Sequence, residues 1–361
     1  MNLKKLEKFW LGKKVFVTGH TGFKGSWLCI MLNELGAKVI GYSLPVSKNN
    51  KLFNEAKIIK KINKSYSGDI RNYDYLKKCI SNSKPEIIIH MAAQAFVRDS
   101  YLNPKYTYEV NTLGTVNVLN IIKELNFIKS ALIVTSDKVY KNFETQKPYN
   151  EKSELGGFDP YSNSKACAEL ITNSYIKSFF ENKHIKIVTA RAGNVIGGGD
   201  YSKNRIVPDY ISCLKYKKKL NLRQPLAIRP WQHVIEPLTG YLMLIEKITR
   251  DKKAKDNYAW NFGPNKESNQ PVIKIVDLLN KYFAYIVKIG YKKNRKNYHE
   301  TNILKLNSSK ATQVLGWKSH LSLDRTIFLI ANWYKLLKEI KDPYLVCKNQ
   351  ILNYYKIIQR I

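Results

Sequence analysis

Five short, mainly apolar segments constrain most strongly what this chain of 361 residues can fold into. They cover residues 14–17, 37–41, 86–90, 130–134 and 185–189. Apolar residues in these segments are nearly continuous and do not alternate with polar ones. This pattern is expected for strands that are buried on both faces of a parallel sheet. Most neighbouring segments are far enough apart for a crossover helix. The sequence therefore predicts an α/β fold with a doubly wound parallel sheet.

The pattern changes after about residue 190, where the chain breaks into shorter pieces rich in Gly, Pro, Asn and Lys. This change predicts a second, smaller lobe that is interleaved with the sheet. We expect the sheet domain at residues 1–193, with 234–263 returning to it, and the lobe at 194–233 and 264–345. Residues 346–361 are expected to form a weakly determined C-terminal tail.

Basic residues are in large excess, with 61 Lys and Arg against 28 Asp and Glu, which gives a formal net charge of +33. The lysines are spread along the chain among many Asn, Ile and Tyr residues. We interpret this as a global bias that favours anionic ligands, and we predict no dedicated nucleic-acid partner. The more distant alternative is a protein that keeps the α/β scaffold without an enzyme activity and binds a polyanion such as a nucleic acid.

The five cysteines are far apart and include no CxxC pair, so the sequence predicts neither a zinc site nor a disulfide framework. No segment has the apolar length needed to cross a membrane, and the first residues lack the apolar core of a secretion signal. We therefore expect a cytoplasmic protein that binds no metal and no membrane. The cysteines are Cys29, Cys79, Cys167, Cys213 and Cys347.

A glycine-rich loop lies between the first predicted strand and a helical pattern, with the sequence Gly19-His20-Thr21-Gly22-Phe23-Lys24-Gly25. Glycines here allow a tight turn, and the following helix offers its free N–H groups to a pyrophosphate. The spacing is GxxGxxG instead of GxGxxG, and Gly41-Tyr42-Ser43-Leu44 supplies no acidic ribose ligand. The loop predicts a dinucleotide, either NAD or NADP; a tight turn without a ligand is the alternative. Gly68-Asp69-Ile70 could contact adenine or form only a turn.

Tyr161 and Lys165 are four residues apart, so they share one face of a helix that we expect to start at Asp159-Pro160. An ammonium group nearby favours a phenolate. We therefore expect Lys165 to lower the pKa of Tyr161, so that the phenolate can accept a hydroxyl proton.

Ser136, Asp137 and Lys138 directly follow the strand predicted at residues 130–134. Because open parallel sheets bind ligands at the carboxyl ends of their strands, these side chains should face the same crevice as the glycine loop. Simple alcohol oxidation by a redox cofactor does not need a hydroxyl, an acid and an amine together at the same place. A surface ion pair between Asp137 and Lys138 is the alternative.

These motifs together resemble the extended short-chain dehydrogenase/reductase family. The resemblance rests on the glycine loop, His90-Met91-Ala92-Ala93-Gln94, Tyr161 with Lys165, and Arg191-Ala192-Gly193-Asn194-Val195. Further segments are similar to the CDP-glucose 4,6-dehydratases within that family, over about residues 9–333. They are Ser26-Trp27 after the loop, Thr135-Ser136-Asp137-Lys138, Asn194-Val195-Ile196-Gly197-Gly198-Gly199-Asp200 and Ile228-Arg229-Pro230-Trp231-Gln232-His233-Val234.

The resemblance implies a Rossmann domain that binds NAD, a lobe that binds the nucleotide sugar CDP-glucose, and a reaction for deoxysugar biosynthesis. It implies that Tyr161 takes the proton of the sugar 4-hydroxyl, supported by Lys165, while Ser136 contacts the 4-oxygen. Lys138 would remove the C5 proton, where dTDP-glucose dehydratases have a Glu, and Asp137 would protonate the departing C6 hydroxyl. The implied cofactor residues are Gly19, His20, Thr21, Gly22, Phe23, Lys24, Gly25, Asp69, Ile70, Met91, Ala92, Ala93, Tyr161 and Lys165.

By the same resemblance, Asn194, Arg205 and Arg229 would hold the diphosphate, and Gln94 would lie near the sugar. An arginine presents a planar fork suited to phosphate, although Arg229 could instead be a structural arginine that caps carbonyl groups. His299-Glu300 also matches the family, without an assigned role. The family further implies a homodimer or higher homo-oligomer, paired through helices that include the Tyr161 helix.

Two other activities fit parts of the pattern. An inverting UDP-N-acetylglucosamine 4,6-dehydratase also has an Asp-Lys pair beside a YxxxK motif, but the Gly19–Trp27 loop and the Arg229–Val234 segment favour CDP-glucose. A sugar epimerase is less favoured because it needs no acid and base at C5 and C6.

Overall fold

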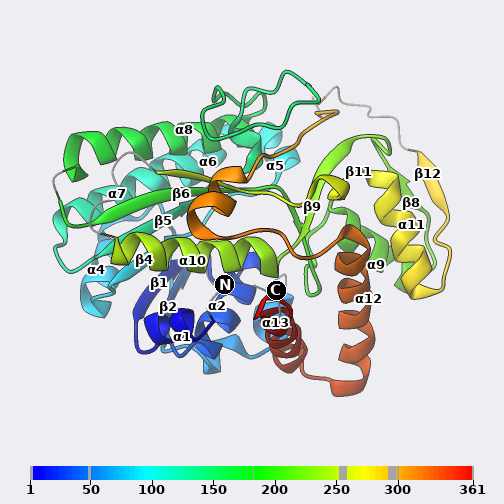
Figure 1. The fold of residues 1–361 in the computed structure, drawn as a ribbon, viewed down its shortest axis with the longest axis horizontal. Helices are drawn as coiled ribbons and strands as arrows, with labels where there is room; N and C mark the ends of the chain where they lie inside the picture. Colours follow the sequence, from blue (N-terminus) through cyan, green and yellow to red (C-terminus); the bar gives the residue numbers. More distant parts are fainter. Residues whose placement is uncertain are drawn as a thin grey trace.

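The computed structural model describes residues 3–47, 50–181, 183–251, 258–291, 298 and 301–359. In this part of the chain the central sheet has seven strands, all paired in parallel, in the order β10-β6-β5-β4-β1-β2-β3 (Figure 1). The predicted doubly wound parallel sheet is confirmed, and each of the five apolar segments contributes one strand. The strands are β1 (Lys14–Thr18), β2 (Lys38–Ser43), β3 (Lys64–Ser67), β4 (Ile87–His90), β5 (Ser130–Val134), β6 (Lys186–Ala192) and β10 (Ala259–Phe262).

Helices cover both faces of this sheet, because the inner strands are apolar on both sides. The first face buries its core under α1 (Leu3–Trp10), α2 (Phe23–Glu34) and α10 (Ile235–Arg250). The opposite face lies under α4 (Tyr73–Ser83), α7 (Gly114–Glu124) and α8 (Pro160–Tyr175). The short helices α3 (Lys51–Glu55), α5 (Val97–Leu102) and α6 (Pro104–Tyr108) lie in the connections.

A smaller lobe stands beside the sheet domain (Figure 1). It contains the three-stranded sheet β7 (Asn194–Ile196), β9 (Ile228–His233) and β11 (Asn269–Pro271), and the pair β8 (Leu220–Leu222) and β12 (Ile289–Tyr291). The helices α9 (Ile206–Tyr216), α11 (Val272–Phe283) and α12 (Leu323–Ile340) share an apolar core with these strands. Between the two parts of the lobe, α10 and β10 return to the central sheet.

The C-terminal segment is a helix, α13 (Pro343–Gln359), so the prediction of a weakly determined tail is wrong for residues 346–359. Its aromatic and aliphatic side chains are buried in the same core as α2 and α10. Polar contacts hold the helix to the end of α2, where the Tyr344 hydroxyl donates to Glu34 and Lys348 pairs with Glu34 at 2.8 Å. Burial of this apolar face orders the segment. None of the helices described here is both long and apolar enough to cross a membrane.

Candidate active site

A cavity of about 1170 Å³ lies where the carboxyl ends of the sheet strands meet the lobe. Its wall on the sheet side is formed by the glycine loop after β1 and by the residues that follow β4, β5 and β6. The start of α8 adds Tyr161 and Lys165, and the lobe adds residues of α9, β8 and β9. The predicted meeting of the glycine loop with Ser136, Asp137 and Lys138 is therefore found in the structure.

Close packing explains why the loop is rich in glycine. Gly19 has a left-handed backbone, with φ of +73°, and a Cβ there would lie 2.7 Å from the backbone nitrogen of Ala92. A Cβ on Gly25 would overlap the carbonyl oxygen of Gly19. Gly22 is the N-cap of α2, and no side chain bonds to the first N–H groups of the helix. The helix N-terminus is thus open toward the cavity, which suits an anion.

We expect Gly25→Ala to lower the free energy of unfolding by about 1–3 kcal/mol, because the added methyl meets backbone atoms that cannot move aside. Gly22→Ala is the matched control, since its Cβ would be 3.4 Å from the nearest atom, at the edge of ordinary contact. Urea unfolding of both variants measures the difference. Equal losses would contradict this account of the loop.

The predicted cofactor residues divide into two groups. Thr21, Met91, Ala92 and Ala93 line the cavity with Gly19, Gly22, Phe23, Lys24, Gly25, Asp69 and Ile70. The side chain of His20 lies outside the cavity lining, because it is buried behind the loop and hydrogen-bonded to Ser43 and Ser65. Burial lowers the pKa of His20 to about 4, so the ring is neutral and supports the loop from behind.

Asp69 follows β3 and faces the cavity. Its carboxylate accepts hydrogen bonds from the Arg71 guanidinium and from the Arg71 backbone N–H at 2.9 Å. The hydrogen bond from the guanidinium is the main reason that the pKa of Asp69 lies below its usual range. Asp69 therefore presents a charged carboxylate at the end of the cavity formed by the β2 and β3 termini.

Ser136 and Asp137 are joined by a hydrogen bond at the end of β5, where the Ser136 hydroxyl donates to Asp137 Oδ1 at 2.9 Å. Asp137 is buried, and its Oδ2 finds no hydrogen-bond partner within the described residues. Burial raises the pKa of Asp137, against the opposing effects of Lys138, the Ser136 hydrogen bond, Arg229 and Lys24. The carboxyl group is thus held near several cations with one oxygen unengaged, so the alternative of a surface ion pair is not what the structure shows.

Helix α8 begins as the sequence predicts. The Asp159 side chain accepts the Ser162 N–H at 3.0 Å, and Pro160 occupies the first turn, so the helix start is fixed. Tyr161 and Lys165 consequently lie on the first two turns and line the cavity. The Lys165 ammonium donates to the carbonyl of Val134 at 3.2 Å.

The electrostatic expectation for Tyr161 is wrong in one respect. Burial raises the pKa of Tyr161 to about 12, and the Ser136 hydrogen bond and Arg205 offset this only in part. Burial also lowers the pKa of Lys165 to about 8. The phenol is therefore protonated at neutral pH, because desolvation of the phenolate outweighs the effect expected from Lys165.

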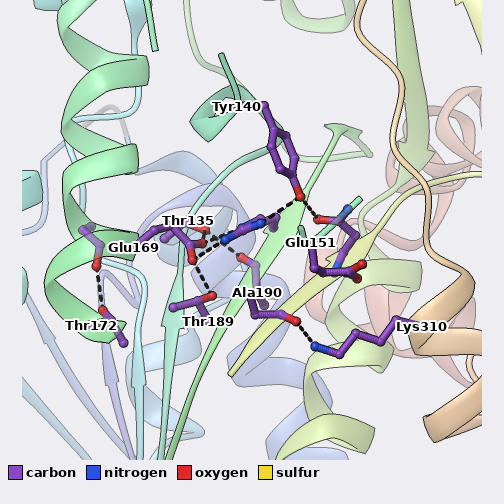
Figure 2. Close-up of polar contacts among 12 residues, drawn as sticks. Thr135, Tyr140, Glu151, Glu169, Thr172, Thr189, Ala190 and Lys310 are labelled. Atoms are coloured by element: carbon purple, nitrogen blue, oxygen red, sulfur yellow. Dashed lines mark hydrogen bonds and ion pairs between the residues drawn. The ribbon is translucent and has the colours of Figure 1, made fainter. Parts of the chain in front are cut away.

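A buried polar network behind the cavity was not predicted (Figure 2). Glu169, one turn after Lys165, accepts from Thr135, from Thr189 at 2.7 Å and from the Arg191 guanidinium at 2.8 Å. Arg191 also donates to the Tyr140 hydroxyl at 2.9 Å. The network ties α8 to the residue that precedes Ser136. A glutamate four residues after Lys165 on the same helix face was the available signal.

Tyr241 of α10 is a second group that sequence reasoning missed. Lys24 donates to its hydroxyl at 3.4 Å, and the ring is fully buried. Burial and nearby Lys165 and Arg205 lower the pKa of Lys24 to about 7. Tyr241 is distant in sequence from every motif, so only the fold could reveal it.

Four of the five predicted substrate residues line the cavity, and one does not. Ser136, Asn194, Arg205 and Arg229 are in the lining. The terminal nitrogens of Arg229 also donate to the carbonyls of Ile228, Thr301 and Asn302, as expected of a structural arginine. Gln94 is absent from the lining, because its side-chain amide bonds to the backbone of Phe96 in both directions. His299 and Glu300 lie outside the described residues.

The family model described as GDP-mannose 4,6 dehydratase matches residues 16–328. The chain belongs to this family. The CDP-glucose 4,6-dehydratase of Salmonella typhimurium strain LT2 is 41% identical to this chain over 360 residues. That alignment covers 98% of this chain and 99% of the Salmonella protein.

Solved structures share the fold of this GDP-mannose 4,6-dehydratase family member. The dTDP-glucose 4,6-dehydratase of Bacillus anthracis, in complex with NAD, has a TM-score of 0.74 at 23% identity and covers 91% of this chain and 98% of its own. The UDP-glucose 4-epimerase of Thermotoga maritima, with UDP-glucose, has a TM-score of 0.77 at 21% identity. It covers 90% of this chain and 99% of its own. At these identities the likeness concerns the fold alone.

Proposed function

We propose that this protein converts CDP-glucose to CDP-4-keto-6-deoxyglucose by an NAD-dependent 4,6-dehydration. The observation that carries the proposal is one cavity in which Tyr161, Ser136, Asp137 and Lys138 face a glycine loop at a helix N-terminus. The Salmonella relative, which matches nearly the whole chain, is a CDP-glucose 4,6-dehydratase. The name of this relative indicates CDP-glucose as the sugar nucleotide. The cavity contains the hydroxyl, acidic and amine groups that a 4,6-dehydration needs.

The sheet-side half of the cavity fits NAD. Glycines leave room for a pyrophosphate at the open N-terminus of α2, and Asp69, Ile70 and Ala92 line the region beyond it. When bound, NAD would supply the hydride chemistry, with C4 as the donor and C6 as the final acceptor. The solved relative from Bacillus anthracis binds NAD. No acidic residue lies at the end of β2, and Asp69 and Ile70 would lie against the adenine.

The residues at the ends of β5 and α8 divide the proton chemistry. Tyr161 takes part in removing the proton of the sugar 4-hydroxyl, and Lys165 is held close by its bond to Val134. The ketone formed at C4 acidifies the C5 proton, which the amine of Lys138 would remove. Asp137 in its acid form would protonate the departing C6 hydroxyl. Asn194, Arg205 and Arg229 would lie along the diphosphate.

Separate incubations with CDP-glucose, UDP-N-acetylglucosamine, dTDP-glucose and GDP-mannose test the proposal. With added NAD, we expect a 4-keto-6-deoxy product from CDP-glucose and no accumulation of NADH, because the hydride returns to the sugar. Turnover of UDP-N-acetylglucosamine alone would assign the enzyme to the inverting dehydratases. No product from any of the four would overturn the assignment, and salt-sensitive binding of polyanions would then be measured.

We also infer a homo-oligomer, at least a dimer, in a reducing and therefore cytoplasmic compartment. All five cysteines of the described chain are unpaired, which supports the compartment. The outer surface of the helices on the side of the sheet covered by α7 and α8 exposes Leu113, just before α7, and Leu170 of α8, with 54% and 56% of their surface accessible. Phe179 also lies exposed there, with Lys123 of α7 over its ring. Exposed apolar side chains on this helical surface suit contact with a second copy of the chain.

Leu170→Glu is expected to shift the protein to the monomer, because it replaces an exposed apolar side chain of α8 by a charge. Leu11→Glu is the matched control, since Leu11 is 70% exposed after α1, on the opposite face of the sheet. Light scattering during size-exclusion chromatography gives the mass of each variant. A Leu170→Glu protein that keeps the wild-type mass would place the interface elsewhere.

A further inference from the structure

The turn between β3 and α4 carries Asp69 at one end of the cavity, and contacts on two sides fix its backbone. The Tyr42 hydroxyl donates to the Asp69 carbonyl at 2.8 Å. The Asn117 side chain donates to the next carbonyl, that of Ile70, at 3.0 Å. Asp69, Ile70 and Tyr42 line the cavity. These contacts hold the turn in place, but they leave the direction of the Asp69 side chain undetermined.

Arg71 fixes that direction. Its Nη2 donates to Asp69 Oδ2 at 2.8 Å, its Nε donates to both carboxylate oxygens at 3.1 Å, and its backbone N–H donates to Oδ1 at 2.9 Å. In the described part of the chain, all donors to this carboxylate belong to Arg71. A carboxylate offers about four acceptor positions, so the N–H groups of Arg71 leave a position for a ligand.

The guanidinium of Arg71 is held on its other side as well. Its Nη1 donates to Glu109 Oε2 at 2.8 Å, and the guanidinium carbon lies 4.9 Å from the centre of the Tyr106 ring. Glu109 begins the π-helical turn Glu109–Leu113, which joins α6 to α7. A planar fork that bonds to two carboxylates and lies over a ring has little freedom to rotate. Arg71 therefore ties the Asp69 side chain to a segment far away in the sequence.

In the proposed function this end of the cavity receives the adenine of NAD. Asp69 is ionised, because the hydrogen bond from Arg71 lowers its pKa, so its oxygens only accept hydrogen bonds. The 6-amino group of adenine is a donor. Hypoxanthine has an oxygen at position 6, so it would place two acceptors against each other. The carboxylate can therefore distinguish the two bases if its direction is fixed.

We propose that Arg71 is a positioning residue, which directs the Asp69 carboxylate at the 6-amino group of adenine and so makes the cofactor site selective for adenine dinucleotides. The inference rests on the NAD dependence of the proposed function. Arg71 acts only through Asp69, because it lies outside the lining of the cavity. The side chains of Asp69 and Arg71 are 28% and 40% exposed, so their ion pair contributes little to stability. Its loss should therefore appear as a loss of selectivity.

Isothermal titration calorimetry of the full chain, freed of nucleotide, tests the inference with NAD and with nicotinamide hypoxanthine dinucleotide as probes. The wild type should bind NAD about 10–100-fold more tightly, the range expected for a hydrogen bond to a charged group. In Arg71→Met this ratio should fall below about 3, because the carboxylate loses its direction. A purely structural role would weaken the binding of both dinucleotides equally and leave the ratio unchanged.

Two further variants support the comparison, and thermal unfolding shows that each protein is folded. Glu109→Gln removes the charge of the anchor but keeps its shape, so its ratio should lie between those of the wild type and Arg71→Met. Lys77→Met is the matched control, since Lys77 pairs with Glu124 at 2.6 Å, is 43% exposed and lies outside the cavity lining. Its ratio should equal that of the wild type.

Two results would overturn the inference while leaving the dehydratase assignment intact. One is an unchanged ratio in Arg71→Met, and the other is a wild type that binds both dinucleotides equally well. A wild type that binds neither dinucleotide would overturn both the inference and the NAD-dependent function.

Discussion

Tyr161→Phe is expected to lower kcat for CDP-glucose by about 10²–10⁴-fold, the usual contribution of a positioned acid or base. The phenol lines the cavity and is the proposed acceptor of the proton of the sugar 4-hydroxyl. Phenylalanine keeps the ring and removes that acceptor. The assay follows the 4-keto-6-deoxy product under saturating CDP-glucose and NAD, and the stability of the variant should stay close to that of the wild type.

Tyr175→Phe provides the matched control for this loss. Tyr175 lies at the end of the same helix, outside the cavity lining, where its hydroxyl donates to Asn120 at 2.9 Å. Its substitution removes the same atom from α8, so kcat should be unchanged. A similar fall in kcat for both variants would show that the phenol of Tyr161 acts through the helix and not on the substrate.

Glu169→Gln is expected to reduce the free energy of unfolding by about 3–5 kcal/mol, because it breaks a buried ion pair and leaves a charge uncompensated. The side chains of Glu169 and Arg191 are 0% and 1% exposed, so water cannot replace the lost partner. Denaturation by urea measures the change. The slope of the free energy of unfolding against urea concentration is compared with that of the wild type. The activity should also fall, since Thr135, which bonds to Glu169, directly precedes Ser136.

An exposed ion pair shows whether burial is the cause. Glu154 pairs with Lys141 at 2.9 Å, and both side chains are more than half exposed. We expect Glu154→Gln to change the free energy of unfolding by less than about 1 kcal/mol, because water and salt screen such pairs. If the two glutamate variants lose equal stability, the network behind α8 does not have the strength assigned to it.

The interior of the sheet was predictable because apolar continuity is a strong signal for buried parallel strands. β1, β4 and β5 carry it plainly, whereas β3 (Lys64–Ser67) escaped because it is a polar strand at the edge of the sheet. α13 was mistaken for a tail, although Tyr354, Tyr355 and Ile358 are buried. Its pattern alternates lysines and asparagines with aromatic residues, and the partner surface that orders it lies far away in the sequence.

The candidate site was predictable where motifs sit at strand and helix ends. The cavity gathers the glycine loop, Ser136, Asp137, Lys138 and Tyr161, because parallel strands bring their carboxyl ends together. His20 and Gln94 lie in segments next to the cavity, as predicted, but their side chains are outside its lining. A local sequence pattern does not predict the direction of a side chain. The pKa of Tyr161 depends on burial by residues that no motif contains.

The position of α13 has a consequence for synthesis of the protein. α2 follows the cofactor loop and is apolar on every side, and its partner surface on α13 is made only when residues 343–359 have been translated. During elongation, Asn33 and Glu34 of α2 therefore stay without their partners Tyr344 and Lys348 while most of the chain is being made. We expect the nascent sheet domain to be a substrate for chaperones on the ribosome, and its cofactor loop to become fully ordered only late in synthesis.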